Sequence, residues 1–169
     1  MTAAPNLSVL YDFENNFDAA LLGWANAVLN PVNCPAFTMF SFETTKMPSV
    51  EIGFFMGPYA LTNGVAHVHA AALPAMVDFF EASFKITANG RRVDKNDPMT
   101  YLRAIHSNLE LRGNATPNLN TFLQWYEILT LDHQGTQRAV NKEDRMDIAE
   151  ATYQIRFCIP QAAFPAGVI

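Results

Sequence analysis

His67 and His69 are the residues in this sequence whose type and spacing most directly suggest chemistry. On a β-strand, residues two apart lie on the same face, so the two imidazoles could bind one metal ion. A zinc site needs further protein ligands, and no third His, Cys or acidic residue lies nearby in the sequence. We therefore expect a polar loop at this point, with no metal ion and no cofactor.

The other residues that could act in acid–base chemistry have no evident partners. Asp78 and Glu81 lie three residues apart on a predicted strand, so they face opposite sides and cannot work as a pair. His106 follows an apolar helix position and is expected at the edge of a buried stripe, without a partner. His133 opens a charged segment and is expected to be solvated.

The sequence contains no recognisable catalytic motif. Gly53 to Gly57 lacks the Lys-Ser/Thr that completes a phosphate loop, and no Gly-x-Ser-x-Gly elbow is present. The acidic run near the end consists of Asp144, Asp147 and Glu150; it matches no known calcium loop, and we expect a solvated edge. Cys34 and Cys158 are expected to be free thiols, as is typical of a reduced cytosolic chain. These observations predict that the protein is not an enzyme.

The composition is poor in charge and rich in aromatic residues. Hydrophobic residues make up 50% of the 169 positions and charged residues 16%, and there are 13 Phe. A usual soluble domain has about 25% charged residues. Either a large core is covered by neutral polar residues, or much of the surface faces other subunits, since interfaces lose charge and gain aromatic and apolar groups.

The net charge of −5 argues against a protein that grips nucleic acid phosphates. No uninterrupted apolar run approaches the ~20 residues that a membrane-spanning helix needs. The first ten residues contain no positive charge, so we expect no secretory signal and no membrane association.

Two helices are predicted from apolar spacing and end signals. The first is marked by Phe13, Phe17, Leu21, Trp24 and Val28 and ends at Asn30-Pro31. The second begins at Asp97-Pro98, with Asp as the cap and Pro at the first position. Its buried stripe comprises Pro98, Leu102, Ile105 and Leu109, and Gly113 is expected to end it.

Four strands are predicted from alternation or from continuous apolar runs. They are Val50 to Phe54 (ending at Gly57-Pro58), Ala75 to Ala88, Phe122 to Leu131 and Ala149 to Ile159, with one possible short strand within 37–42. The third run is apolar on both faces, which predicts a central, doubly covered strand. Asp132 to Asp147 is expected to be the polar excursion of a long hairpin, and 57–74 a loop that docks on a neighbour.

This order of elements predicts one α+β domain over residues 1–169. Consecutive strands without a helical crossover imply antiparallel pairs, and both helices remain available for one face. We expect an antiparallel sheet of about four strands with two helices packed on one face.

The C-terminal segment supplies a resemblance to a known family. It reads Tyr153-x-Ile-x-Phe-x-Ile159, followed by a Pro-containing tail that ends in Ala-Ala-Phe-Pro165. Together with the order of elements from Phe13 onward, this resembles bacteriophage neck and tail-completion proteins, including the tail terminators of long-tailed phages. Residues 57–74 are longer and more apolar than in that pattern.

The resemblance implies a virion structural protein that is assembled in the host cytoplasm. Such a protein forms a ring, commonly a homohexamer, that caps the tail tube, contacts the head connector or stopper, and leaves a channel through which DNA passes without specific binding. Subunit contacts are expected on exposed loops and strand edges, at Tyr59, His67, His69, Arg138, Lys142, Glu143, Asp144, Arg145 and Phe164.

Other functions remain open. Within the same class, the chain could be a head-completion or stopper protein, or a tail-tube subunit. From another class, it could be a small-molecule or metal-binding module with a pocket between helices and sheet, lined by His67, His69, Phe122, Trp125 and Tyr126. A nucleic-acid binder is disfavoured by the acidic balance.

Overall fold

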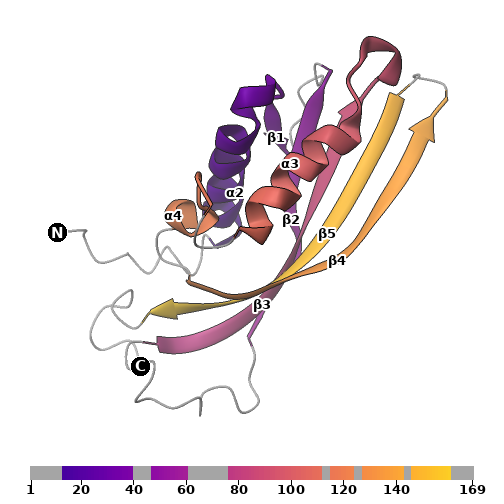
Figure 1. Cartoon of the computed structure of the whole chain (residues 1–169). Coiled ribbons are helices and arrows are strands. Elements are labelled where there is room, and N and C mark those ends of the chain that lie inside the picture. Colours follow the sequence, from indigo (N-terminus) through magenta and orange to yellow (C-terminus); the bar gives the residue numbers. More distant parts are fainter. Residues whose placement is uncertain are drawn as a thin grey trace.

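The computed structural model describes residues 13–39, 47–60, 76–111, 115–123, 127–142 and 146–160. A five-stranded sheet carries its helices on one face, giving two layers (Figure 1). Along the chain the main elements are α2 (Phe13–Leu29), β1 (Ala36–Thr38), β2 (Ser49–Ala60), β3 (Met76–Gly90), α3 (Pro98–Glu110), α4 (Leu119–Leu123), β4 (Glu127–Asn141) and β5 (Met146–Pro160). The predicted α+β class, with the helices on one face, is therefore confirmed.

The sheet has the order β1-β2-β3-β5-β4 and is mixed, because β1 runs parallel to β2. The predicted antiparallel sheet of about four strands is close to this arrangement: β2 to β5 form four antiparallel strands, and the short parallel strand β1 is the addition. After α2, a short 3₁₀ helix, η1 (Asn30–Val32), turns the chain back along the helix, and the chain then enters the sheet beside β2. Asn26 of α2 holds this return, since its Oδ1 accepts a 2.9 Å hydrogen bond from Ala36 N.

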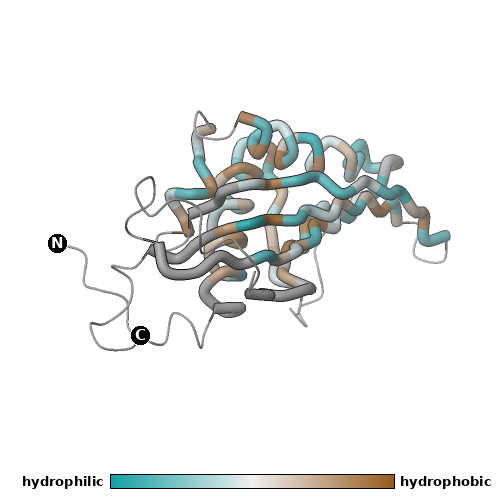
Figure 2. Tube along the Cα trace, turned by 90° about the horizontal axis from the view of Figure 1, so that it is seen from below, coloured by the Kyte–Doolittle hydropathy of each residue, from teal (hydrophilic) through white to brown (hydrophobic). Residues whose placement is uncertain are grey.

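The core lies between the helices and the three inner strands. Alternate residues of these strands face the helices and are buried: Val50, Ile52, Phe54, Ala82, Phe84, Ile86, Ala88, Ala149, Ala151, Tyr153, Ile155 and Phe157. Hydropathy alternates along the strands in the same way (Figure 2). From α2, Phe17 meets Phe54 and Phe157 at ring-centroid distances of 5.5 and 6.0 Å. The alternation predicted for these strands is thus confirmed.

Both predicted helices are present, and α3 begins as expected. The Asp97 side chain caps α3 by accepting a 3.0 Å hydrogen bond from Met99 N. The helix ends at Glu110 with Leu111 as its C-cap, which is earlier than the predicted end at Gly113, a residue outside the described part. None of the described helices is long and apolar enough to cross a membrane.

The segment Phe122 to Leu131 is not one central strand. Phe122 and Leu123 close the short helix α4, and Leu123 is buried. The strand starts at Glu127 and forms the outer edge of the sheet, beside β5. An apolar run of this kind fits a buried helix as well as a buried strand. Here Phe122 and Leu123 belong to α4, whereas Leu131 belongs to β4.

The polar segment Asp132 to Asp147 forms the end of a long hairpin, as expected. β4 continues to Asn141, and β5 resumes at Met146. This end of the hairpin lies at the upper right of Figure 1. Its β5 residues Ala149 and Ala151 are buried, whereas residues 132–140 of β4 are all exposed. Because neither face of this part of β4 is buried, the alternation that marks a half-buried strand is missing.

Irregular pairing is concentrated on the two strands flanking the central β3–β5 pair. In β2 the register shifts between Phe54 and Met56 and again between Met56 and Tyr59, so the strand continues past Gly57-Pro58, where it was expected to end. In β4 the register shifts before Thr130 and at Gly135, which has φ +156°. A bulge tolerates a residue that cannot donate to the ladder, which explains how Pro58 is accommodated.

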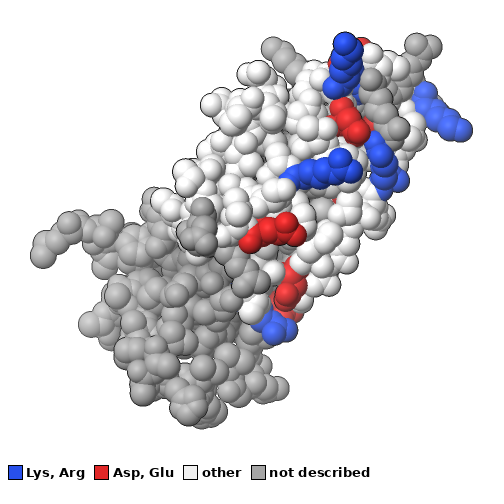
Figure 3. Space-filling view, viewed as in Figure 1, with Lys and Arg blue, Asp and Glu red and all other residues white. Residues whose placement is uncertain are grey.

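Charged side chains are unevenly distributed over the surface. Lys and Arg gather mostly toward the end where α3 begins and the β4–β5 hairpin turns, whereas the surface over α2 and α4 is largely without charge (Figure 3). Residues 19–39 and 115–123 contain no Asp, Glu, Lys or Arg. We call the exposed part of these two segments the uncharged helix surface.

Candidate functional site

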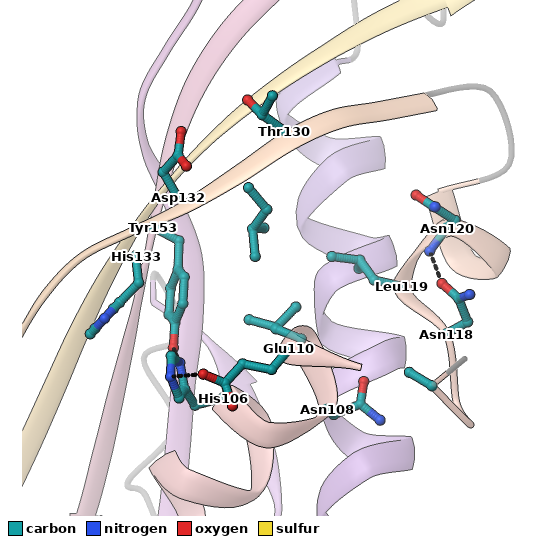
Figure 4. A pocket seen from close by; sticks show the side chains of 13 residues that line it. His106, Asn108, Glu110, Asn118, Leu119, Asn120, Thr130, Asp132, His133 and Tyr153 are labelled. Carbon is teal, nitrogen blue, oxygen red and sulfur yellow. Dashed lines mark hydrogen bonds and ion pairs between the residues drawn. The ribbon is translucent and has the colours of Figure 1, made fainter. Parts of the chain in front are cut away.

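A hollow of about 620 Å³ lies between the C-terminal half of α3, α4 and the strands β4 and β5 (Figure 4). Its lining is mixed, with polar side chains from all of these elements and several apolar ones between them. The lining residues are His106, Asn108, Leu109, Glu110, Ala115, Asn118, Leu119, Asn120, Thr130, Leu131, Asp132, His133 and Tyr153. A cavity of this size fits a small ligand.

Tyr153, His106 and Glu110 form a continuous chain of polar contacts at one side of the hollow. The Tyr153 hydroxyl lies 2.9 Å from Nδ1 of His106, and Nε2 of His106 lies 3.1 Å from Oε1 of Glu110. Tyr153 comes from the buried face of β5, whereas the other two residues are one helical turn apart on α3. The chain therefore joins the sheet to the helix that covers it.

The partners determine how protons are placed along this chain. The Glu110 carboxylate can only accept, so Nε2 of His106 carries a hydrogen. In the neutral imidazole, Nδ1 is then the acceptor, and the Tyr153 hydroxyl donates to it. Protonation of His106 would reverse that bond, with the tyrosine oxygen accepting, and would convert the contact with Glu110 into an ion pair.

His133 completes an aromatic cluster with this chain. In the β4–β5 ladder it stands directly opposite Tyr153, which places both side chains on the same face of the sheet. Its ring centroid lies 4.9 Å from that of His106 and 5.2 Å from that of Tyr153. Nε2 of His133 is 2.9 Å from Oγ1 of Thr136, a contact that fixes the ring orientation.

Burial, and secondarily the negative charge of Glu110, raises the pKa of Tyr153 to about 12. The phenol is therefore protonated at neutral pH, which suits a hydrogen-bond donor rather than a base or nucleophile. Its ring also stacks on Phe84, at a centroid distance of 5.2 Å and an interplanar angle of 14°. The Tyr153 ring is thus held in place by packing, and its hydroxyl positions the His106 ring.

Asp132 borders the hollow, but its carboxylate does not point into it. In the ladder Asp132 pairs with Gln154, next to the His133–Tyr153 pair, so its side chain lies on the opposite face of the sheet. Figure 4 shows it pointing away from the space. Among the described residues, the lining contains no Lys or Arg, and the Glu110 carboxylate contacts His106.

The contact residues expected from the sequence do not form one site in the described residues. Arg138 lies on β4 and pairs with Asp97 at 3.0 Å, and Lys142 is exposed at the turn after β4. Tyr59 lies in β2, where its backbone pairs with Glu81 of β3. The remaining predicted contact residues, His67, His69, Glu143, Asp144, Arg145 and Phe164, lie outside the described residues.

His106 is half-buried beside the apolar stripe and His133 is exposed, as expected, but both have partners that the sequence did not reveal. One signal was available, because His106 and Glu110 are four apart on a predicted helix and so lie on the same face. The contact with Tyr153 could not be predicted without the sheet register. Of the residues suggested for a pocket between helices and sheet, Phe122 is not in the lining, and Trp125 and Tyr126 lie outside the described part.

Other candidate chemistry finds no support in the described ranges. No group of three or more His, Cys, Asp or Glu residues within those ranges could hold a metal ion. Cys34 is a free thiol, as expected, and burial raises its pKa to about 12. A thiol with that pKa is unreactive at neutral pH.

Comparison with protein-family models finds no match to the chain, and comparison with curated proteins finds none either. The function is therefore argued from the surfaces and contacts of the chain itself. Two features are relevant: the uncharged helix surface and the hollow beside the Tyr153–His106–Glu110 chain.

Proposed function

We propose that this chain is a structural protein of a bacteriophage virion that assembles into a ring at the head–tail junction. In this role it acts as a tail terminator, which caps the tail tube, docks to the head connector and leaves a channel for DNA. The resemblance of its C-terminal strand and element order to that family motivates the proposal. The observation that carries it is the uncharged helix surface.

The uncharged helix surface has the composition of a subunit contact. Its exposed positions include Ala19, Asn26, Ala27, Val32 and Thr121, and no charged residue lies among them. Protein interfaces are depleted in charge at their centre, whereas a solvent-facing helix usually carries charged residues on its outer face. A neighbouring subunit that covers this surface explains why 21 consecutive residues, 19–39, lack charge.

A head-to-tail contact needs a second, different surface, on the flank of the subunit opposite the uncharged helix surface. β4 forms the edge of the sheet opposite β1, on which α2 packs, and its end at Asn141 lies far from α2 (Figure 1). Two different contact surfaces on opposite flanks favour a head-to-tail arrangement of identical copies, which closes into a ring when the rotation allows. The β4–β5 hairpin, with Arg138 and Lys142 near its end, is the exposed part of that flank.

The charge of the chain also suits a DNA conduit. A net charge of −5 disfavours tight binding of phosphates, so DNA could move through the ring. Basic side chains in the described part are partly neutralised by neighbours, as Lys85 is by Glu150 and Arg156 by Glu81. Sequence-specific DNA binding is not part of this proposal.

The test is the mass of the purified protein in solution, combined with negative-stain images. We expect rings for the wild type and loss of rings for Ala27→Arg, which places a charge in the uncharged helix surface. Thr100→Arg is the matched control, because Thr100 is exposed on α3 outside both proposed contacts. Long tubes would favour a tail-tube subunit instead. A strict monomer at the highest soluble concentration, or equal effects of both variants, would contradict the proposal.

A further inference from the structure

We infer that the end of the molecule at which α3 begins is a docking surface for an acidic segment of another protein. We call this surface the basic end; its exposed members are Arg91, Val93, Lys95, Val140 and Lys142. The inference goes beyond ring assembly and does not depend on it, because it concerns this end of the subunit and not the uncharged helix surface.

Strand register brings the two segments of the basic end together. Gly90, the last residue of β3, pairs with Asp147 of β5, and Asp147 pairs with Val140 of β4. Neighbouring strands lie about 4.8 Å apart, so the end of β3 is about 10 Å from the end of β4. The ion pair between Asp97 and Arg138 holds the start of α3 against the same hairpin. The connection from β3 to α3 therefore lies beside the hairpin end, as Figure 1 shows.

This connection is held in one conformation by backbone hydrogen bonds. The carbonyl oxygen of Arg91 accepts from Asp94 N at 3.0 Å and from Asn96 N at 3.1 Å, around the short helix η3 (Arg92–Asp94). The loop also packs closely on the end of β3, since a Cβ at Gly90 would overlap the carbonyl oxygen of Asn96. A surface that is already ordered loses little conformational freedom when a partner binds.

The bases of the basic end lack counter-charges. Among the described residues, the side chains of Arg91, Lys95 and Lys142 make no ion pair or hydrogen bond. By contrast, Lys85 and Arg156 on the sheet are paired with carboxylates at 2.7 and 2.9 Å. The basic end therefore has charge available for a partner.

The distribution of charge along the chain gives this end the opposite sign to the rest of the molecule. Residues 90–103 and 138–147 contain seven of the 11 Lys and Arg but five of the 16 Asp and Glu, which leaves +2 there and −7 in the remainder. Lys and Arg gather at this end on the face shown in Figure 3. An acidic partner would be attracted to this end and repelled by the remainder of the chain.

Exposed apolar side chains favour a polypeptide partner over nucleic acid. Val93 is 84% exposed and Val140 58% exposed, and they are two of the four large apolar residues that are exposed in the described part. A polypeptide can cover these valines with its own apolar side chains while its carboxylates meet the bases. Nucleic acid would offer mainly phosphates, which leave the valines uncovered and are repelled by the exposed Asp94 between them and the start of α3.

A second copy of the chain offers no matching acidic surface in the part that the structure describes. Away from the basic end, the carboxylates of known exposure already have hydrogen-bond or ion-pair partners, with one exception. Those with partners are Asp18, Glu51, Glu81, Glu110 and Glu150. Asp132 is the exception, since it is exposed and has no such partner among the described residues. One isolated carboxylate cannot compensate several bases, so we assign the acidic segment to a different protein.

The test is fluorescence anisotropy of a labelled peptide, in which Leu alternates with Asp and Glu, titrated with the full chain. The matched probe is the same peptide with Asn and Gln in place of the acids. We expect saturable binding of the acidic peptide that weakens as salt is added, and about tenfold weaker binding of the amide peptide. A labelled DNA duplex is titrated in parallel. Tighter binding of DNA than of the acidic peptide would assign the basic end to nucleic acid and overturn the inference.

Two substitutions at exposed positions test the two parts of the surface. Lys95→Gln removes a base and Val93→Ser an apolar side chain, and each should weaken binding of the acidic peptide about fivefold. The controls Arg156→Gln, on the sheet, and Leu111→Ser, at the end of α3, should leave it unchanged. No saturable binding, equal binding of the two peptides, or equal loss in variants and controls would overturn the inference. Rings that form without peptide binding would refute this inference alone, and peptide binding by a strict monomer would refute only the ring.

Discussion

Asp97 and Arg138 join the start of α3 to the outer strand of the sheet. Nη2 of Arg138 donates a 3.0 Å hydrogen bond to Oδ1 of Asp97. The same oxygen accepts from the backbone N–H of Met99, also at 3.0 Å, and thereby caps the helix. One carboxylate oxygen thus serves both the helix end and the contact with β4.

Substitution of Asp97 should separate these two roles. Asp97→Ala removes both the cap and the ion pair and should lower the free energy of unfolding by about 1–2 kcal/mol. Asp97→Asn keeps a capping oxygen and should cost less than about 1 kcal/mol, similar to Arg138→Ala, because the pair is partly exposed. Urea unfolding monitored by circular dichroism measures all three. If Arg138→Ala cost as much as Asp97→Ala, the cap would not be the larger contribution.

Removal of the Tyr153 hydroxyl should affect His106. Tyr153→Phe leaves Nδ1 of His106 without its partner and should lower the free energy of unfolding by about 1 kcal/mol. The ring contact with Phe84 remains, so the fold should be retained. NMR of the His106 ring should show altered Nδ1 and Nε2 shifts. Tyr101→Phe, which removes a 3.3 Å hydrogen bond to Asn96, is the control and should leave those shifts unchanged.

Stability should fall at high pH because of Tyr153. The folded state holds the pKa of this phenol at about 12, against 10.0 for an unperturbed tyrosine, so the unfolded chain loses its proton first. The stabilising contribution is complete below pH 10 and is lost as pH rises from 10 toward 12, up to about 3 kcal/mol in total. Measurements in a Cys34→Ala background remove the parallel effect of the buried thiol. Tyr153→Phe should flatten this part of the pH profile, and an unchanged slope would contradict the assignment.

Cys34 should resist modification while the protein is folded. It is 3% exposed, and burial raises its pKa to about 12, so both access and thiolate formation are limited. In a Cys158→Ser variant, iodoacetamide at neutral pH should label Cys34 slowly in buffer and quickly in urea. Fast labelling in buffer would mean that the region around β1 opens readily.

Truncation of Phe157 should be among the costly substitutions in the core. Its ring is fully buried and contacts Phe17 of α2 across the two layers. Phe157→Ala should lower the free energy of unfolding by about 3–5 kcal/mol through lost burial and the cavity left behind. Val140→Ala on β4, where the side chain is 58% exposed, is the control and should change stability by about 0.5 kcal/mol or less. Similar effects of the two would place Phe157 outside the core.

The elements with a strong local pattern were predictable from the sequence. The four-residue spacing of Phe17 and Leu21 and the cap at Asp97 identified the helices, and alternation from Ala149 to Phe157 identified β5. β4 was not predictable in the same way, because residues 132–140 are all exposed, so burial does not impose alternation there. The apolar run Phe122 to Leu131 also predicted a central strand, whereas β3 pairs with β5 and leaves β4 at the edge.

The candidate site could be predicted only in part, for a related reason. His106 and Glu110 were detectable from their helical spacing. His133 and Tyr153 are 20 residues apart and become neighbours through a register that includes the shift at Gly135. A register with such a shift depends on backbone geometry that residue types alone do not specify.

The register shifts of β4 also affect the tendency of the chain to aggregate while it is being synthesised in a crowded cell. A regular, extended segment from another molecule could pair with the backbone of β4 over only a few residues. At Thr130 and Gly135 the register shifts, and its hydrogen-bond donors and acceptors would no longer match those of β4. Long exposed strands normally template fibrillar aggregates, and shifts of this kind oppose such growth. The outer strand can therefore remain exposed without committing the chain to irreversible self-association.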